Sequence, residues 1–179
     1  MASNGTLAAM SSAISPDAAR TRTTTWSDPR ILLDAFAGMP GLELLQGIVA
    51  GALPQAPISH TMGFALVAAG PGETRFRCLP GEFLYNPQGT VHGGVAATLL
   101  DSCMGAAVMS TLDAESAYTT TQLSISLVRP ILADTGELFA DGKVVHRGGR
   151  LVTAEGKLTD AKGRLLAHGT TCCMIIPRG

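Results

Sequence analysis

The chain has 179 residues, of which 46% are hydrophobic and 15% are charged, and its formal net charge is -1. This length fits one domain with a sizeable core, and the near-neutral charge argues against a general nucleic-acid binder, which needs a basic surface. No uninterrupted apolar run reaches the roughly 18 residues of a membrane span. We therefore expect no nucleic-acid partner and no membrane partner.

The cysteines and histidines give no sign of a metal site. The four cysteines contain no CxxC pair, and no two histidines have metal-ligand spacing. Adjacent Cys172 and Cys173 would point to opposite faces of a strand. We interpret the cysteines as buried, reduced thiols, which predicts a cytoplasmic protein without a metal.

The first 50 residues contain two predicted helices after a tail. Residues 1–27 are rich in Ala, Ser and Thr without apolar periodicity and lack the pattern of a secretory signal, so we predict a disordered tail. Asp28-Pro29 is typical of a helix start and Gly38 of its end. A second helix is predicted over 42–50. Residues 28–51 would thus be a helical extension of one domain covering 28–179.

A hairpin and a long helix follow. From about His60 the hydrophobic period changes to two, Gly70-Pro71-Gly72 turns the chain, and residues 74–79 alternate again. Residues 93–111 are apolar on almost every side, which is typical of a buried helix. Asp101 in its middle and the flanking strands argue against a membrane helix.

Four further strands are predicted over 118–129, 138–147, 150–159 and 164–176. We expect short turns between them and therefore antiparallel neighbours. One long helix packed on one antiparallel sheet is an α+β arrangement.

The start of the long helix is a candidate binding site for a carbonyl oxygen. The first N–H groups of a helix lack internal partners and carry the positive end of its dipole. Without a side chain at Gly93 or Gly94, a ligand oxygen can approach closely. The alternative is that both glycines serve only the turn and close packing.

Three polar residues are further candidates, each with a structural alternative. Asp101 interrupts an apolar helix and suits a general base, unless it only caps a neighbouring backbone. The amide of Asn86 would bind a substrate carbonyl or water, or simply hold a turn. His92 would donate to substrate, or fix the loop.

The separation of Gly93 and Asp101 has a consequence for assembly. Eight residues of helix span about 12 Å, which is too far for both groups to act on one carbonyl. If both act on one substrate, Asp101 comes from a second copy of the chain. The sequence thus predicts a two-fold dimer with two interfacial sites.

The run Asn86-Pro87-x-Gly89-x-x-His92-Gly93-Gly94, with Asp101 nine residues after the histidine, resembles the hotdog-fold acyl-CoA thioesterases of the phenylacetate-degradation (PaaI-like) branch. The resemblance covers about residue 30 to the C-terminus. It implies a hotdog fold, in which a curved antiparallel sheet wraps a long central helix. It also implies edge-to-edge dimers that commonly pair into homotetramers.

The resemblance also assigns roles. Gly93 would polarise the thioester carbonyl with Gly94 beside it, Asp101 of the partner would activate water or attack directly, and Asn86 and His92 would orient the reactants. A hydroxyl residue after the helix assists the aspartate in some members, and Thr120 best fits that place. Coenzyme A is part of the substrate, so no separate cofactor is implied. The candidates for binding its phosphates lie in one hairpin: Arg147, Gly148, Gly149 and Arg150.

We therefore predict an acyl-CoA thioesterase that releases free CoA and a carboxylic acid. The alternatives are a non-catalytic acyl-CoA-binding or sensor protein of the same fold, and a hydratase or dehydratase, whose motif is spaced differently. Residues 31–50 would form a flap over the acyl end of the pocket. The acyl group is not encoded in any motif.

Overall fold

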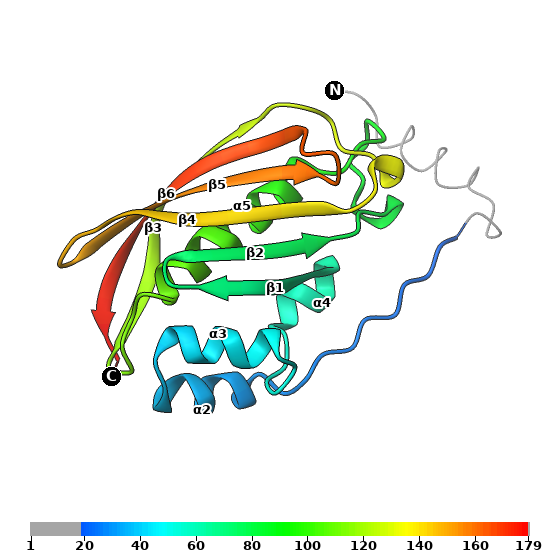
Figure 1. Cartoon of the computed structure of the whole chain (residues 1–179). Coiled ribbons are helices and arrows are strands. Elements are labelled where there is room, and N and C mark those ends of the chain that lie inside the picture. Colours follow the sequence, from blue (N-terminus) through cyan, green and yellow to red (C-terminus); the bar gives the residue numbers. More distant parts are fainter. Residues whose placement is uncertain (1–18, 179) are drawn as a thin grey trace, which may run out of the picture.

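The computed structural model describes residues 19–178 and contains one antiparallel sheet with a long helix across one face (Figure 1). The order of the strands across the sheet is β1-β2-β4-β5-β6-β3. Their bounds are β1 Phe64–Gly70, β2 Glu73–Cys78, β3 Ser116–Leu127, β4 Leu138–Arg147, β5 Leu151–Asp160 and β6 Leu165–Pro177.

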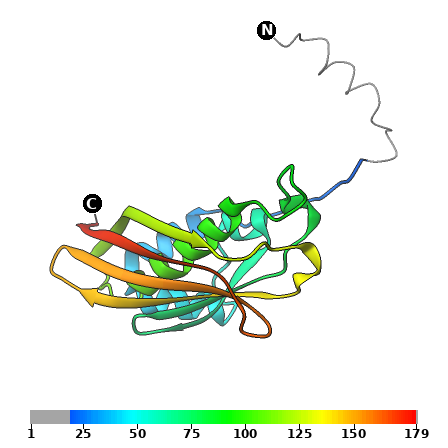
Figure 2. The ribbon, with the colours of Figure 1, turned by 90° about the horizontal axis from the view of Figure 1, so that it is seen from above.

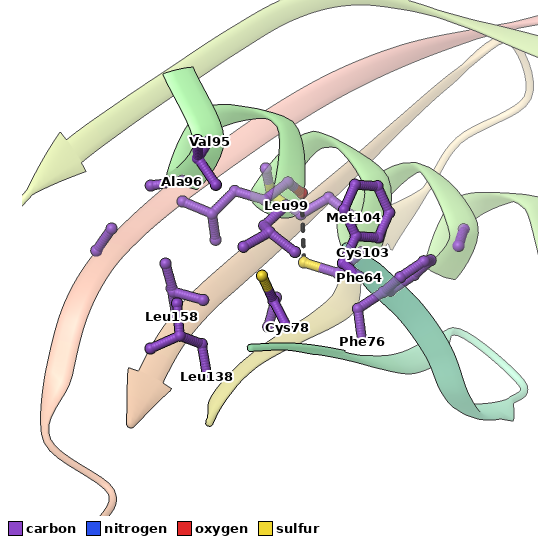
Figure 3. Packing of buried hydrophobic residues seen from close by; sticks show 14 of the residues in the cluster. Phe64, Phe76, Cys78, Val95, Ala96, Leu99, Cys103, Met104, Leu138 and Leu158 are labelled. Atoms are coloured by element: carbon purple, nitrogen blue, oxygen red, sulfur yellow. Dashed lines mark hydrogen bonds between the residues drawn. The ribbon is translucent and has the colours of Figure 1, made fainter. Parts of the chain in front are cut away.

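The long helix α5 covers Gly93–Met109, and its side chains form the centre of the core. Leu99, Leu100 and Met104 are fully buried. Figure 2 shows the helices on one side of the curved sheet, and Figure 3 shows α5 side chains packed over the strands. The predicted buried helix and the α+β hotdog arrangement are confirmed.

A glycine in β4 lets α5 approach the sheet closely. A Cβ atom added to Gly142 would lie 2.2 Å from the backbone oxygen of Cys103 on α5. The same carbonyl accepts a 2.7 Å hydrogen bond from the Thr74 hydroxyl on β2. These contacts fix the height of α5 above the middle of the sheet.

The cysteines are free, as predicted, and three of the four are buried. Burial raises the pKa of the Cys78 thiol to about 11 and that of the Cys103 thiol to about 12. Both thiols face the core below α5 (Figure 3), where they act as small apolar groups.

Three short helices precede the sheet: α2 (Arg30–Gly38), α3 (Gly41–Val49) and α4 (Pro57–Met62). They lie beyond β1 at one edge of the sheet (Figure 1). The two helices predicted within 28–51 are confirmed, although α2 begins one residue later than expected. Pro29 occupies the N-cap position, and the Asp28 carboxylate accepts a 2.9 Å hydrogen bond from the Arg30 N–H.

The prediction that the first strand begins near His60 is wrong, because His60 lies in α4. Pro57 starts this helix, and Gly63 ends it in the left-handed conformation with φ 77°. The strand starts at Phe64. Met62, the first apolar residue of the predicted alternation, belongs to α4 instead.

The prediction that the last four strands are joined by short turns is wrong for β3 and β4. β3 pairs with β6, while β4 pairs with β2 and β5. The segment 128–137 crosses between them and includes the 3-10 turn η3 (Ala133–Thr135). Its Ile131 carbonyl binds the N–H of Val91, so the crossing segment holds the loop before α5.

The two edges of the sheet differ. At the β1 edge, the Gln55 side chain pairs with both backbone groups of Leu66, at 3.0 and 3.1 Å, and α3 packs beside the strand (Figure 1). At the other edge, β3 is twelve residues long and exposes Leu123 and Leu127. A long, uncovered edge strand with exposed apolar side chains favours pairing with another chain.

Residues 1–18 of the predicted tail lie outside the described residues. Residues 19–27 contain no helix or strand. Arg22 in this segment donates to the backbone oxygens of His60 and Thr61 and stacks over the ring of Phe83 at 4.1 Å. Within residues 19–178, no helix has the length and apolarity needed to cross a membrane.

The close approach at Gly142 predicts a stability effect. We expect Gly142→Ala to lower the free energy of unfolding by about 2 kcal/mol, because the methyl group would push β4 away from rigid backbone of α5. Urea denaturation would measure it. Gly149→Ala is the control, since a Cβ there meets no atom within 4 Å, and equal loss in both variants would refute the explanation.

Candidate active site

The loop before α5 is held by Asn86. Its side-chain oxygen accepts hydrogen bonds from the N–H groups of Gln88 (2.9 Å) and Thr90 (3.3 Å), and its amide donates to the Thr90 hydroxyl at 2.9 Å. Gly89 completes the turn with φ 77°. The side-chain oxygen of Asn86 is therefore occupied by hydrogen bonds within the turn, and only one hydrogen of its amide group remains available to a ligand.

His92 caps α5 with its own ring. Its Nδ1 atom accepts a 2.9 Å hydrogen bond from the N–H of Gly94, the second residue of the helix. An accepting Nδ1 places the ring proton of the neutral imidazole on Nε2. The exposed ring thus presents an Nε2–H donor beside the helix start.

The N–H of Gly93 has no acceptor among residues 19–178, whereas Gly94 donates to His92 and Val95 to the His92 carbonyl. A substrate oxygen would therefore have to compete with the His92 ring for the N–H of Gly94, which was predicted to donate to substrate. A Cβ on Gly93 would meet the Leu127 side chain at 2.7 Å. Both the chemical and the packing interpretation of Gly93 have support.

A hollow of about 310 Å³ lies over this helix start. It brings together three of the predicted residues, Asn86, His92 and Gly93, with the segment after β3 that carries Arg129. Arg129 donates to the Leu165 carbonyl and, within the described residues, has no carboxylate partner. Sequence analysis missed it; a lone arginine between an alternating strand and Pro130 was the available signal.

Asp101 and Thr120 form a second cluster. The Thr120 hydroxyl donates a 3.1 Å hydrogen bond to the Asp101 carboxylate, from β3 to α5. Asp101 is half-buried, not fully buried as its apolar helix suggested. It continues a less buried stripe of α5 that also contains Gly94, Ala97 and Thr98, at spacings of three and four residues.

One chain does not join the two clusters. Asp101 and Thr120 do not line the hollow at the helix start, and eight residues of helix separate Asp101 from Gly93 by about 12 Å. Each chain therefore carries two separate polar clusters on the same helix.

The predicted phosphate-binding hairpin lies elsewhere again. Arg147 to Arg150 form the tip between β4 and β5, and the Arg147 side chain contacts the Thr111 carbonyl at 3.4 Å, just past the end of α5. This is the opposite end of the helix from Gly93. Within one chain, the hairpin does not contribute to the hollow.

Comparison with known proteins shows a family to which the chain is similar. The model of the thioesterase superfamily matches residues 88–167, which include the helix start, Asp101 and Thr120. This part of the chain is similar to the thioesterase superfamily. A Halobacterium salinarum protein named as a candidate esterase is 40% identical over 92 residues, which are 49% of this chain and 59% of that protein. The match thus spans less than two thirds of this relative.

Solved structures of other proteins share the fold. A candidate thioesterase of Ralstonia eutropha, described as related to phenylacetic acid degradation, has a TM-score of 0.66 and 26% identity, covering 73% of this chain and 98% of that chain. A Streptococcus mutans protein solved with acetyl-CoA bound has a TM-score of 0.59 and 24% identity, covering 65% and 90%. The predicted resemblance to hotdog-fold thioesterases is confirmed.

The cap at His92 gives a prediction that separates its two roles. We expect His92→Ala to lower the free energy of unfolding by about 1 kcal/mol, because the Gly94 N–H loses its acceptor. His92→Asn should retain most of that stability, because asparagine is a good cap. Thermal unfolding measures both, and equal destabilisation by the two changes would contradict the capping role.

Proposed function

We propose that the protein is an acyl-CoA thioesterase, which hydrolyses a thioester to a carboxylic acid and free CoA. The observation that carries the proposal is the pair of half-sites on α5: an N–H at Gly93 that has no acceptor within residues 19–178, and a carboxylate at Asp101 that Thr120 holds in place. A thioester needs only a polarised carbonyl and one carboxylate, because its leaving group is a thiolate.

A two-fold dimer would combine the half-sites. The open edge of β3 and the less buried stripe of α5 lie on the same side of the chain, because Thr120 on β3 bonds Asp101 on that stripe. Pairing two copies through β3 would cover both features. It would set two α5 helices side by side and antiparallel.

The register of β3 supports this arrangement. Gly93 lies against Leu127, and Asp101 is bonded to Thr120, so the two half-sites mark two positions on β3. The pairing of β3 with β6 shifts its register between Thr120 and Gln122. This shift lets Thr120 and Leu127 both face α5, although they are an odd number of residues apart. A two-fold axis near Ser124, midway between them, would place Asp101 of one chain near Gly93 of the partner subunit.

The reaction then consumes one water. The Gly93 N–H, with the positive end of the α5 dipole behind it, stabilises the negative charge that develops on the thioester oxygen. Asp101 either takes a proton from the attacking water or attacks the carbonyl itself. In both routes the C–S bond breaks, the acyl carbon gains a water oxygen, and the thiolate receives a proton.

The CoA portion has basic groups available at both ends of α5. The bound acetyl-CoA of the Streptococcus mutans relative supports CoA as the leaving group. Arg129 lines the hollow beside Gly93 of its own chain. The hairpin with Arg147 and Arg150 lies at the other end of α5, so it would contact CoA only in the site of the partner subunit. Light scattering should give at least a dimer of the 18.4 kDa chain, and a tetramer if dimers pair.

Removal of the carboxylate tests catalysis. We expect Asp101→Asn to reduce CoA release from acyl-CoA by about 10²-fold or more, because the amide keeps the shape of the side chain but cannot act as base or nucleophile. A thiol-trapping assay with a panel of acyl-CoAs measures the rate. Asp113→Asn, a change at an exposed aspartate outside both half-sites, is the control and should retain full activity.

The same assay distinguishes the main alternative. Acyl-CoA binding by calorimetry without any thiol release in the wild type would identify a sensor rather than an enzyme. In that case Asp101 would serve only its hydrogen bond with Thr120.

Removal of the N–H at Gly93 tests the other half-site. Gly93→Pro deletes the donor, fits the first position of a helix and suits the extended backbone of His92 (ψ 135°). Gly93→Ala keeps the donor and makes the same contact with Leu127. We expect proline to reduce kcat by about 10²-fold or more and alanine to have a much smaller effect.

Mixing the two inactive variants tests the shared site. Random co-assembly of Asp101→Asn with Gly93→Pro chains gives mixed dimers with one intact site, so about a quarter of wild-type activity should return. Each variant alone should stay inactive after the same unfolding and refolding. Failure of the mixture to recover activity, with mixed dimers verified by mass spectrometry, would show that each site lies within one chain.

A further inference from the structure

A second cavity, separate from the hollow at Gly93, lies beneath the N-terminal helices. It has a volume of about 280 Å³, and residues of α2, α3, α4, β1, β2, α5 and β3 line it. The helices lie beyond the β1 edge of the sheet (Figure 1), so the cavity fills the angle between them, the sheet and α5.

The lining is almost entirely apolar. Half of the eight aromatic residues of the chain gather here: Phe36, Phe64, Phe76 and Tyr118. Gln55 is also part of the wall, but its amide is occupied by the backbone of Leu66. A cavity of this kind suits an uncharged hydrocarbon ligand.

The cavity extends to the Asp101 half-site. Ser102 lines it directly after Asp101. Tyr118 lines it from β3, and its hydroxyl lies 2.6 Å from where a Cβ on Gly105 would be, one helical turn beyond Asp101. Burial raises the pKa of the Tyr118 phenol, and the charges of Cys173 and Asp101 raise it further, which places Asp101 within electrostatic range of the cavity wall.

The shape of the cavity favours a chain over a compact ring. Ser102, Ala106 and Met109 form one face of α5 along it, and seven residues of helix span about 10 Å. With about 30 Å³ for each water-sized group, the cavity holds on the order of nine heavy atoms. It is about twice the size of an engineered 150 Å³ apolar cavity that binds benzene.

We propose that this cavity binds the tail of a medium-chain aliphatic acyl group, of about eight to ten carbons, with the thioester at the Asp101 end. The inference rests on the proposed thioesterase function and names its substrate class. Helices α2 and α3 are then the wall that sets the length of the acyl chain.

The C-terminal segment fixes that wall. The guanidinium of Arg178 stacks on the ring of Phe36 at 3.5 Å and donates to the carbonyls of Phe36 and, at 2.7 Å, of Ala114. Phe36 belongs to α2, and Ala114 precedes β3. Arg178 therefore ties the helical wall to the body of the domain, so the cavity has a defined far end.

Filling the cavity tests the proposal. Ala106→Leu adds three carbons to its floor, so the ratio of kcat/KM for decanoyl-CoA to that for acetyl-CoA should fall at least tenfold. Ala37→Leu makes the same change on an exposed position of α2 outside the cavity and should leave the ratio unchanged. In the opposite direction, Phe36→Ala should move the preferred length toward longer chains.

Binding of free decanoate, measured by calorimetry, is the readout that does not depend on turnover. Wild type and Ala37→Leu should bind it, and Ala106→Leu should bind it at least tenfold more weakly. Circular dichroism verifies that both variants are folded.

The outcomes separate this inference from the proposed function. Thiol release that favours acetyl-CoA or phenylacetyl-CoA, or a decanoyl preference that Ala106→Leu leaves intact, would overturn the cavity proposal while the thioesterase remains. Absence of thiol release from every acyl-CoA would overturn the thioesterase. Decanoate binding that is lost in Ala106→Leu would then still support the cavity as a hydrocarbon site, and no binding would overturn it.

Discussion

The distance between α5 and the middle of the sheet is the constraint on which the remaining geometry depends. Gly142 has no side chain, so β4 passes close to the Cys103 carbonyl, and the Thr74 hydroxyl binds that same oxygen. The helix is thereby held low over the sheet. Its N-terminus then meets the loop before it, and its middle meets β3, where Thr120 reaches Asp101. If α5 lay farther from the sheet, the contact between Asp101 and Thr120 would be lost first, because it depends on one side-chain hydrogen bond.

A rigid helix also sets what one chain can do. Since Gly93 and Asp101 are about 12 Å apart on one axis, no side-chain rotation brings them to a common carbonyl. The sheet leaves one edge covered by Gln55 and α3 and the other edge open. In the proposed dimer, the open edge is what allows a second copy to supply the missing group. Assembly and catalysis would therefore depend on the same strand.

Local patterns predicted the elements well, and non-local pairing was not predictable from them. The apolar helix over 93–111 and the turn at Gly72, which has a positive φ, follow from residue type alone. The error at His60 arose because Met62, at the end of α4, has the same spacing of two from Phe64 as a strand residue, although Pro57 and Gly63 marked the ends of the helix. The pairing of β3 with β6 has no local signal, because it depends on a crossing segment whose hydrogen bonds involve distant residues.

The candidate site divides in the same way. The motif around His92 and the aspartate nine residues later were visible in the sequence, and the resemblance supplied Thr120 as the partner of Asp101. The use of Asn86 within its own turn was one of two open interpretations that only coordinates distinguish. Arg129 and the second cavity were missed, because seven separate elements build that cavity and none carries its pattern alone.

The hollow at Gly93 and the cavity under α2 and α3 have different chemical characters, and this difference has a physical consequence for specificity. The hollow at Gly93 has amide, imidazole and guanidinium groups among its apolar lining residues, whereas the cavity under α2 and α3 is almost entirely apolar. The groups proposed to act on the thioester lie on α5 and β3, in the core of the domain. The wall proposed to set the length of the acyl chain is formed by α2 and α3, which Arg178 and contacts at the β1 edge join to that core. Substitutions in the wall would therefore change substrate length without moving Asp101 or Gly93.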